Sequence, residues 1–358
     1  MESTDTIHQS INVAEFISAC VYLAEESGKI IRDVWNSGVL DKQSKAHDMS
    51  PVTIADLRVQ KNINENLQKL FPTLTIEGEE DKSTYDKYEA TIRTEDISLD
   101  FINSELLNEA NANRLGYLES LKDIYGEETF AYPFNQFSTE KAIVWIDPLD
   151  GTSEFVKGNL SAITILIGLS IDGTSKIGIV HYPFSHEDPE LGKTIFGSLE
   201  HGCFKLISNA KLDYLWHRER TLETIESFSQ ADMPSQDQIL RITTTSNRFT
   251  EEIQRQLNLC GPIEIVKLGG AGNKCCSVAL GLVDAYIVPT YGMSYWDLCA
   301  PECIIKGMGC QASNIHCGKF TYHQQKDKQI KGVIIAKNSH YYQLIVNRFQ
   351  KTNFLKIL

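Results

Sequence analysis

The most informative stretch of this chain runs from Ala142 to Thr152 and reads Ala-Ile-Val-Trp-Ile-Asp-Pro-Leu-Asp-Gly-Thr. Its first five residues are apolar, β-branched or aromatic, which predicts a buried strand. We expect Asp147 at the end of this strand, where Pro148 stops the hydrogen-bond ladder and Gly151 lets the backbone turn. Residues 152–157 can begin a helix, and the free N–H groups at a helix start favour an anion such as phosphate.

Two carboxylates, Asp147 and Asp150, stand at this corner and can converge on a hard cation such as Mg²⁺. Asp-Pro and Asp-Gly are also common turn pairs, so a solvated turn explains the same residues without any chemistry. The stretch alone leaves both interpretations open. It does exclude an Asp-x-Asp nucleophile pair, because two residues intervene, and the chain contains no Gly-x-x-x-x-Gly-Lys-Ser/Thr phosphate loop.

The overall charge of the 358-residue chain is −13 at pH 7, with 42% hydrophobic residues. That hydrophobic content is ordinary for a globular protein with a substantial core. A strongly acidic chain is not expected to bind polyanions by bulk electrostatics, so we expect no nucleic-acid partner and no membrane partner. A small phosphorylated metabolite is still compatible with this charge, provided that local cations receive it. We expect a monomer.

The nine cysteines include no Cys-x-x-Cys pair, and the N-terminal residues are polar rather than basic and then apolar. The longest apolar run, 162–169, is too short to span a bilayer. We therefore expect a reduced, cytoplasmic protein with buried free thiols. A zinc-organised module built on Cys299, Cys303, Cys310 and Cys317 is the less favoured alternative.

Hydrophobic periodicity predicts helices over 11–35 and 54–70 and a short strand at 74–76. Two antiparallel hairpins are expected to pair 162–170 with 176–182 and 194–199 with 203–206. The polar stretch 82–140 predicts a mostly helical or loop insertion, and 208–238 a peripheral segment. Further on, strands at 240–245, 263–267, 285–288 and 332–336 alternate with helices at 249–258, 272–281, 298–307 and 339–350. Mixed hairpins and crossovers indicate a layered α/β architecture whose sheets are covered by helices.

Three further acids stand at element boundaries. Glu79 follows a strand end and a glycine, Asp297 is placed like a helix N-cap, and Asp56 lies at the polar start of the second helix. Each has an ordinary explanation as a turn residue, a cap or a first-turn acid. Their presence in one chain with Asp147 and Asp150 is harder to explain in that way and favours a shared site.

Four motifs occur in a fixed order along the chain: Thr53-Ile54-Ala55-Asp56, Gly78-Glu79-Glu80, Asp147-Pro148-Leu149-Asp150-Gly151-Thr152 and Trp296-Asp297-x-x-Ala300-Pro301. This set resembles the inositol monophosphatase superfamily of magnesium-dependent, lithium-sensitive phosphomonoesterases. Residues 268–274 and 296–302 are most similar to its bisphosphate nucleotidase branch, with the inositol polyphosphate 1-phosphatase branch close to it. The resemblance implies a layered αβαβα sugar-phosphatase-type fold with mixed and largely antiparallel sheets. We expect a metal-binding N-terminal part, 1–205, and a C-terminal part, 206–358, that completes the active site.

The resemblance also implies roles for individual residues. The implied ligands of two or three Mg²⁺ ions are Glu79, Asp147, the carbonyl of Leu149, Asp150 and Asp297. Asp56 and Thr152 match the pair that activates the attacking water. Substrate contacts are implied at Gly151, Thr152, Thr245, Arg248, Gly270 and Lys274. One departure from the nucleotidase pattern concerns an Arg-Ser-His run, which is replaced here by Ser246-Asn247-Arg248. An arginine at this place can grip a second phosphate of a nucleotide or of an inositol phosphate.

Charge arithmetic supports the metal interpretation independently of the resemblance. Each carboxylate at contact range repels a unit phosphate charge by ~4 kcal/mol at intermediate dielectric, and two Mg²⁺ would remove this repulsion. We expect a phosphatase that removes one phosphate from 3′-phosphoadenosine 5′-phosphate, inositol 1,4-bisphosphate or both. The alternatives are a sugar phosphatase of the fructose-1,6-bisphosphatase type and a non-catalytic sensor of a phosphorylated ligand.

Overall fold

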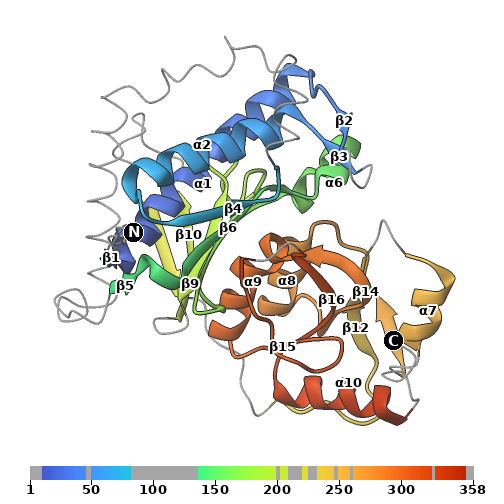
Figure 1. Cartoon of the computed structure of the whole chain (residues 1–358). Helices are drawn as coiled ribbons and strands as arrows, with labels where there is room; N and C mark the ends of the chain where they lie inside the picture. Colours follow the sequence, from blue (N-terminus) through green and yellow to red (C-terminus); the bar gives the residue numbers. More distant parts are fainter. Residues whose placement is uncertain are drawn as a thin grey trace.

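The protein is arranged in alternating layers of helices and sheets (Figure 1). The computed structural model describes residues 10–45, 50–81, 136–198, 202–208, 220–224, 232–245, 249–258, 261–324 and 327–351. Within them, a helix pair covers a seven-stranded sheet, a second helix pair separates that sheet from a five-stranded one, and further helices cover the outer side. The expected αβαβα fold, with mixed and largely antiparallel sheets, is confirmed.

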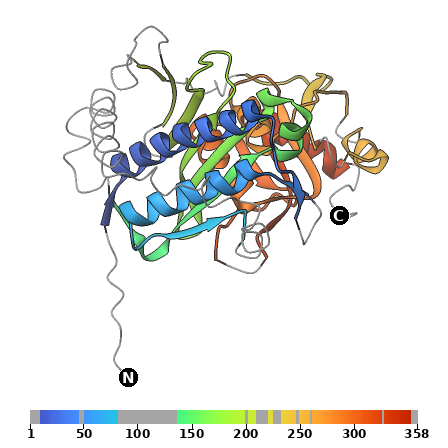
Figure 2. The ribbon, with the colours of Figure 1, turned by 90° about the horizontal axis from the view of Figure 1, so that it is seen from above.

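The first layer consists of α1 (Val13–Ser37) and α2 (Ile54–Leu70), which lie side by side on the seven-stranded sheet (Figure 2). Val59, Ile63 and Leu67 recur every four residues in α2 and are fully buried against this sheet and its neighbours. Both helices were predicted from this periodicity. The side chain of Thr53 caps the start of α2, which explains why the helix begins where the sequence indicates.

The seven-stranded sheet has the order β11-β10-β9-β8-β7-β6-β4. Neighbouring strands are antiparallel except β4 and β6, which are parallel. The predicted hairpins are β7 with β8 and β9 with β10, so both are confirmed. The strands are β4 (Thr75–Gly78), β6 (Ala142–Asp150), β7 (Thr164–Ile171), β8 (Thr174–Tyr182), β9 (Lys193–Ser198), β10 (Gly202–Ser208) and β11 (Arg220–Thr224).

Strand β6 does not end at Asp147, and the prediction that Pro148 stops its ladder there was wrong. The ladder with β7 shifts register after Asp147 and resumes when Asp150 pairs with Thr164. Proline removes one donor, but a local irregularity absorbs that loss and the strand continues. Gly151 then adopts φ 92°, and helix α6 (Thr152–Lys157) begins at the predicted residue.

The five-stranded sheet has the order β13-β12-β14-β16-β15, with β12 parallel to β13 and β14 and the other pairs antiparallel. Helices α8 and α9 lie between the two sheets, and α10 packs on β15 and β16 from the outer side. The strands are β12 (Leu240–Thr243), β13 (Ile263–Ile265), β14 (Ala285–Ser294), β15 (Gln311–Asn314) and β16 (Gln329–Ala336). The helices are α7 (Glu251–Asn258), α8 (Ala271–Ala279), α9 (Tyr295–Gly307) and α10 (Ser339–Lys351).

The short pairs β1 (Ser10–Asn12) with β5 (Gln136–Ser138) and β2 (Gln43–Ser44) with β3 (Pro51–Val52) complete the sheets. Short 3₁₀ helices, η3 (Thr139–Lys141) and η4 (Leu160–Ala162), flank β6 and α6. The prediction of a helical or loop insertion over 82–140 is wrong at 136–138, which form β5, and residues 82–135 lie outside the described residues. Residues 208–238 were predicted to be peripheral, and β11, which lies within this segment, is the edge strand of the seven-stranded sheet.

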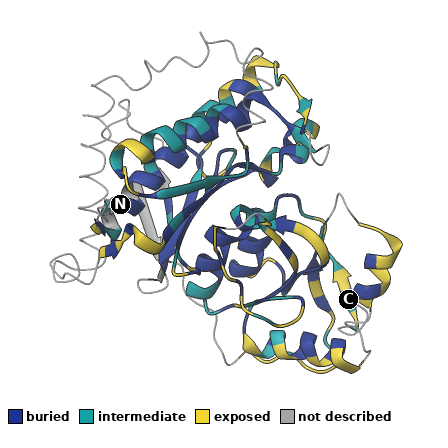
Figure 3. Ribbon diagram, in the orientation of Figure 1, coloured by how far each residue is buried: buried dark blue, intermediate teal, exposed yellow. Residues whose placement is uncertain are grey.

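The core follows the layers, because the buried residues lie on the faces that the helices and sheets turn towards one another (Figure 3). Helix α9 is buried almost throughout, and the backbone of Ala300 approaches the glycines of β7 and β8 so closely that a Cβ at Gly178 would collide with it. Seven of the eight described cysteines are buried and all eight are free thiols, as expected. Among the described residues, we find no helix that is both long and apolar enough to cross a bilayer.

Candidate active site

Three aspartates meet between the two sheets. Asp147 and Asp150 come from β6 and Asp297 from the first turn of α9, and each offers a carboxylate oxygen within 4.8 Å of the other two. Asp297 is not the N-cap that the sequence suggested. Ser294 caps α9, and Asp297 is the third helical residue, whose carboxylate accepts the Ser294 N–H at 2.5 Å. Among the described residues, the group of side chains found close enough to share a metal contains these aspartates and no cysteine.

Asp150 also joins strand β6 to helix α8. Its carboxylate accepts the hydroxyl of Thr164 at 2.7 Å and the N–H groups of Ala271 and Gly272 at 2.7 and 2.8 Å. Free N–H groups at a helix start favour an anion, so α8 is docked at its N-terminal end by a carboxylate of the cluster. The position of α8 therefore depends on Asp150.

Asp56 and Thr152 are brought together as predicted. The Thr152 hydroxyl lies 2.9 Å from one Asp56 oxygen, while the other Asp56 oxygen accepts the N–H and hydroxyl of Thr53 at 2.7 and 2.6 Å. Burial raises the pKa of Asp56 to about 6, although Lys45 and Thr53 act to lower it. The hydrogen bonds from Thr53 and Thr152 fix the orientation of the Asp56 carboxylate.

Glu79 lies on the turn that follows β4. Its N–H donates to the carbonyl of Ile146, and the side-chain amide of Gln60 bonds to both the N–H and the carbonyl of Glu80. A Cβ at Gly78 would collide with Gln60, which explains the glycine that precedes the two acids. Helix α2 thus holds the backbone that presents Glu79.

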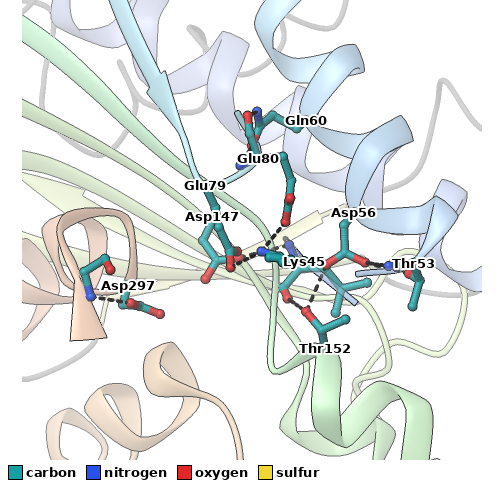
Figure 4. Close-up of polar contacts among 11 residues, drawn as sticks. Lys45, Thr53, Asp56, Gln60, Glu79, Glu80, Asp147, Thr152 and Asp297 are labelled. Carbon is teal, nitrogen blue, oxygen red and sulfur yellow. Dashed lines mark hydrogen bonds and ion pairs between the residues drawn. The ribbon is translucent and has the colours of Figure 1, made fainter. Parts of the chain in front are cut away.

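A buried lysine that the sequence did not reveal lies among these acids. Lys45 Nζ is 2.6 Å from Glu79 Oε1 and also pairs with Glu80, and its side chain is only 2% exposed. Figure 4 shows it between Glu79, Glu80 and Asp56. Burial lowers the pKa of Lys45, but the attraction of Glu79 and Glu80 outweighs it and raises that pKa. No local pattern singles out this lysine, because its partners lie on a different segment.

The cluster carries more negative than positive charge. Burial raises the pKa of Asp147, and the negative charges of Glu79, Asp150 and Asp297 raise it further. Burial and the charge of Asp150 likewise raise the pKa of Asp297 to about 8. Two buried lysines, Lys45 and Lys274, face the acids. With every carboxylate ionised, six negative charges against two ammonium groups would leave four uncompensated charges, which two divalent cations would neutralise. The acids of the group are Asp56, Glu79, Glu80, Asp147, Asp150 and Asp297.

The residues present fit a hard divalent cation, because the donors are carboxylate oxygens held close together, with Asp147 and Asp150 buried and Asp297 half-buried. The carbonyl oxygen of Leu149, also predicted as a ligand, lies 3.1 Å from the Thr152 hydroxyl oxygen, next to the contact between Thr152 and Asp56. Glu79 is near Asp147 but is bound by Lys45.

The structure brings some of the predicted substrate-binding residues together near the aspartates. Gly151 and Gly270 both adopt positive φ, and a Cβ at Gly151 would lie 3.5 Å from the Gly270 Cα, so their backbones face each other closely. Lys274 is 6% exposed, and its ammonium group is attracted to Asp150. Thr245 is half-buried just beyond β12, and Arg248 lies outside the described residues.

Comparison with known proteins agrees with this fold and geometry. The family model of the inositol monophosphatase family matches residues 12–98 and 104–353. This chain therefore belongs to the inositol monophosphatase family.

Similar proteins include two 3′(2′),5′-bisphosphate nucleotidases 1. The one from Dictyostelium discoideum is 28% identical over 351 residues, covering 95% of this chain and 98% of the relative. The one from Mus musculus is 28% identical over 332 residues, covering 91% of this chain and 92% of the relative. Human inositol polyphosphate 1-phosphatase is 27% identical over 291 residues, covering 72% of this chain and 70% of the relative. Inositol monophosphatase II from Staphylococcus aureus has a similar structure, with a TM-score of 0.60, 15% identity and 96% coverage of both chains.

Proposed function

We propose that this chain is a Mg²⁺-dependent phosphomonoesterase that removes one phosphate from a small bisphosphorylated metabolite. The observation that carries the proposal is the Thr152–Asp56 hydrogen bond beside the cluster of Asp147, Asp150 and Asp297. A non-catalytic sensor of a phosphorylated ligand has no need for a threonine and a buried carboxylate arranged to accept a proton.

Glu79, Asp147, Asp150, Asp297 and the carbonyl of Leu149 would hold the divalent ions. Ions bound there supply charge to polarise the phosphoryl oxygens and lower the pKa of a bound water. The chain itself contributes the arrangement of ligands, because β6 presents two aspartates and the start of α9 presents the third.

Thr152 and Asp56 accept the proton of the attacking water. Because the Thr152 hydroxyl donates to Asp56, its lone pairs are available to accept a hydrogen bond from water. With a pKa of about 6, Asp56 is mostly ionised at neutral pH and can receive the proton that Thr152 relays. The two hydrogen bonds from Thr53 keep the carboxylate in the orientation that this relay needs.

The substrate phosphates are received by a lysine of α8 and by the backbone at the starts of α6 and α8. Lys274 offers a buried positive charge, while Gly151 and Gly270 allow the substrate to approach the backbone closely. We assign Thr245 and Arg248 to the part of the substrate that is not hydrolysed, because both follow β12 in the sequence and an arginine can hold a second phosphate.

Two substrate classes fit the names of the relatives. Nucleotides with phosphates at the 3′ and 5′ positions are favoured by the bisphosphate nucleotidases, and inositol 1,4-bisphosphate by the inositol polyphosphate 1-phosphatase. Fructose 1,6-bisphosphate is the less favoured alternative. We also propose that the protein acts as a monomer in the cytoplasm, because its buried free thiols suit a reducing compartment.

The experiment that tests the proposal measures phosphate release from 3′-phosphoadenosine 5′-phosphate and inositol 1,4-bisphosphate side by side. Each reaction is run with Mg²⁺, with EDTA and with Mg²⁺ plus lithium. We expect Mg²⁺-dependent turnover of at least one substrate and inhibition by lithium. Binding of both compounds without turnover would favour the sensor.

A further inference from the structure

An ion pair outside the aspartate cluster links the two sheets beside it. Glu77 on β4 pairs with Lys328, which lies just before β16, and the side-chain amide of Gln324 donates to the other Glu77 oxygen at 3.0 Å. The two charged side chains are 17% and 23% exposed. We call Glu77, Gln324 and Lys328 the clasp.

Each side of the clasp is close along the backbone to a proposed metal ligand. Glu77 precedes Glu79 on the same strand end, where the Glu79 N–H continues the ladder by donating to Ile146. On the other side, the carbonyl of Lys328 accepts the N–H of Tyr295 at 3.0 Å, two residues before Asp297. The clasp therefore spans the gap between the strand that carries Glu79 and the helix that carries Asp297.

Packing makes both connections stiff. The ring of Tyr295 meets Trp145 edge to face, with centroids 5.2 Å apart, and Trp145 pairs with Glu77 across β6 and β4. The Lys328 ammonium also lies 6.0 Å from the ring centroid of Trp296, the neighbour of Asp297. A displacement of the Glu77–Lys328 pair should therefore also displace Glu79 and Asp297, because the residues between them are tightly packed.

We propose that the Glu77–Lys328 ion pair, supported by Gln324, positions Glu79 relative to Asp297 so that both can serve the same group of divalent cations. The inference rests on the proposed metal-dependent function. Glu77 and Lys328 are positioning residues, since they act through the ligands and need touch neither ion nor substrate. Partly exposed ion pairs contribute little to folding stability, whereas groups that orient metal ligands commonly change metal affinity 10–100-fold, roughly.

The test uses the full chain with Glu77→Gln and with Lys328→Met, and compares both with Glu187→Gln. Glu187 is a matched control, because its ion pairs with Lys193 and Lys205 involve none of the site residues. Mn²⁺ binding is measured by calorimetry in the absence of substrate, and urea unfolding is measured in EDTA. We expect Mn²⁺ to bind both clasp variants about tenfold more weakly than the unaltered protein, while their urea midpoints stay unchanged. The Glu187→Gln control should bind Mn²⁺ as tightly as the unaltered protein does. Exchanging the charges, Glu77→Lys with Lys328→Glu, should restore part of the affinity.

Unchanged Mn²⁺ affinity in both clasp variants would overturn the inference and leave the proposed function standing. A loss of affinity that runs parallel to a lowered urea midpoint would overturn it as well, since the pair would then be merely structural. Failure of the unaltered protein to bind Mn²⁺ would contradict the proposed function, and this inference with it.

Discussion

The hydroxyl of Thr152 lies 2.9 Å from Asp56 Oδ1, although 96 residues separate them in the sequence. Thr152 begins helix α6, directly after strand β6, and Asp56 lies in the first turn of α2. This contact brings two helix-start residues together beside three clustered aspartates, and the proposed function assigns to this pair the acceptance of a proton.

Replacement of Thr152 by alanine should lower kcat about 10²–10⁴-fold, because general base catalysis contributes on that scale. Thr152→Ser keeps the hydroxyl and is the matched control, expected to retain most of the rate. Steady-state kinetics at saturating Mg²⁺ measures both. If alanine and serine variants were equally impaired, loss of the methyl group rather than of the hydroxyl would be responsible.

Asp147→Asn should stabilise the metal-free protein while abolishing phosphate release. Asp147 is buried, and its pKa is raised by burial and by Glu79, Asp150 and Asp297, so removal of its charge relieves repulsion. Thermal unfolding in EDTA should show a higher Tm than for the unaltered protein, and added Mg²⁺ should stabilise the variant less. A lower Tm in EDTA would show that repulsion does not dominate this cluster.

Asp150→Asn should also abolish phosphate release but should not stabilise the protein. Its carboxylate accepts hydrogen bonds from Thr164, Ala271 and Gly272, and an asparagine would turn its NH₂ group towards one of these donors. We expect a loss of ~1–3 kcal/mol in unfolding free energy, measured with urea. Retention of most activity would contradict the assignment of Asp150 as a metal ligand.

Lys45→Met should destabilise the protein by ~3 kcal/mol, because it removes the partner of two buried or half-buried carboxylates. Glu80→Gln in the same chain removes one of the charges left behind, so the double variant should regain much of that loss. Urea unfolding of the single and double variants in EDTA measures the coupling. Additive effects of the two changes would mean that Lys45 and Glu80 do not interact in solution.

His181 should make the protein sensitive to acid. It is fully buried, and burial followed by the charge of Arg32 lowers its pKa from 6.5 to about 3. Between these values the unfolded chain binds a proton that the folded chain excludes, so stability is lost as pH falls below 6.5, by about 1.4 kcal/mol per pH unit. Above pH 6.5 the histidine is neutral in both states and has no such effect.

His181→Leu should therefore weaken the acid dependence of the unfolding free energy, with ~2 kcal/mol less loss between about pH 6.5 and pH 5. Urea unfolding at several pH values gives this slope, and the exposed His316, replaced by glutamine, serves as the control. An unaltered slope in His181→Leu, matching that of the control, would contradict the buried neutral state of His181.

Much of the fold was predictable because the signals are local. Helix α2 begins and ends at the predicted residues, since Thr53 caps it and its apolar residues recur every four positions. Helix α6 is bounded by two glycines with positive φ, Gly151 and Gly158, which are equally visible in the sequence. By contrast, β15 is a polar strand recognised only through its pairing with β16, and periodicity could not reveal it.

The site was predictable to the extent that its residues stand in contiguous motifs. Lys45 could not be found, because its role arises only when its segment is folded against Glu79 and Glu80. The end of β6 was misplaced for a related reason, since the pairing of Asp150 with Thr164 depends on a neighbouring strand. Proline predicts the loss of one hydrogen bond but cannot predict whether the ladder resumes.

The central claim is that the carboxylates hold Mg²⁺ for phosphate hydrolysis, and one measurement tests it most directly. Phosphate release from 3′-phosphoadenosine 5′-phosphate and inositol 1,4-bisphosphate is followed while Mg²⁺ is titrated into metal-free protein and into Asp147→Asn. Our account predicts turnover of at least one substrate that rises with Mg²⁺ in the unaltered protein and stays at background in the variant. Turnover in EDTA, or equal activity of the two proteins, would contradict it.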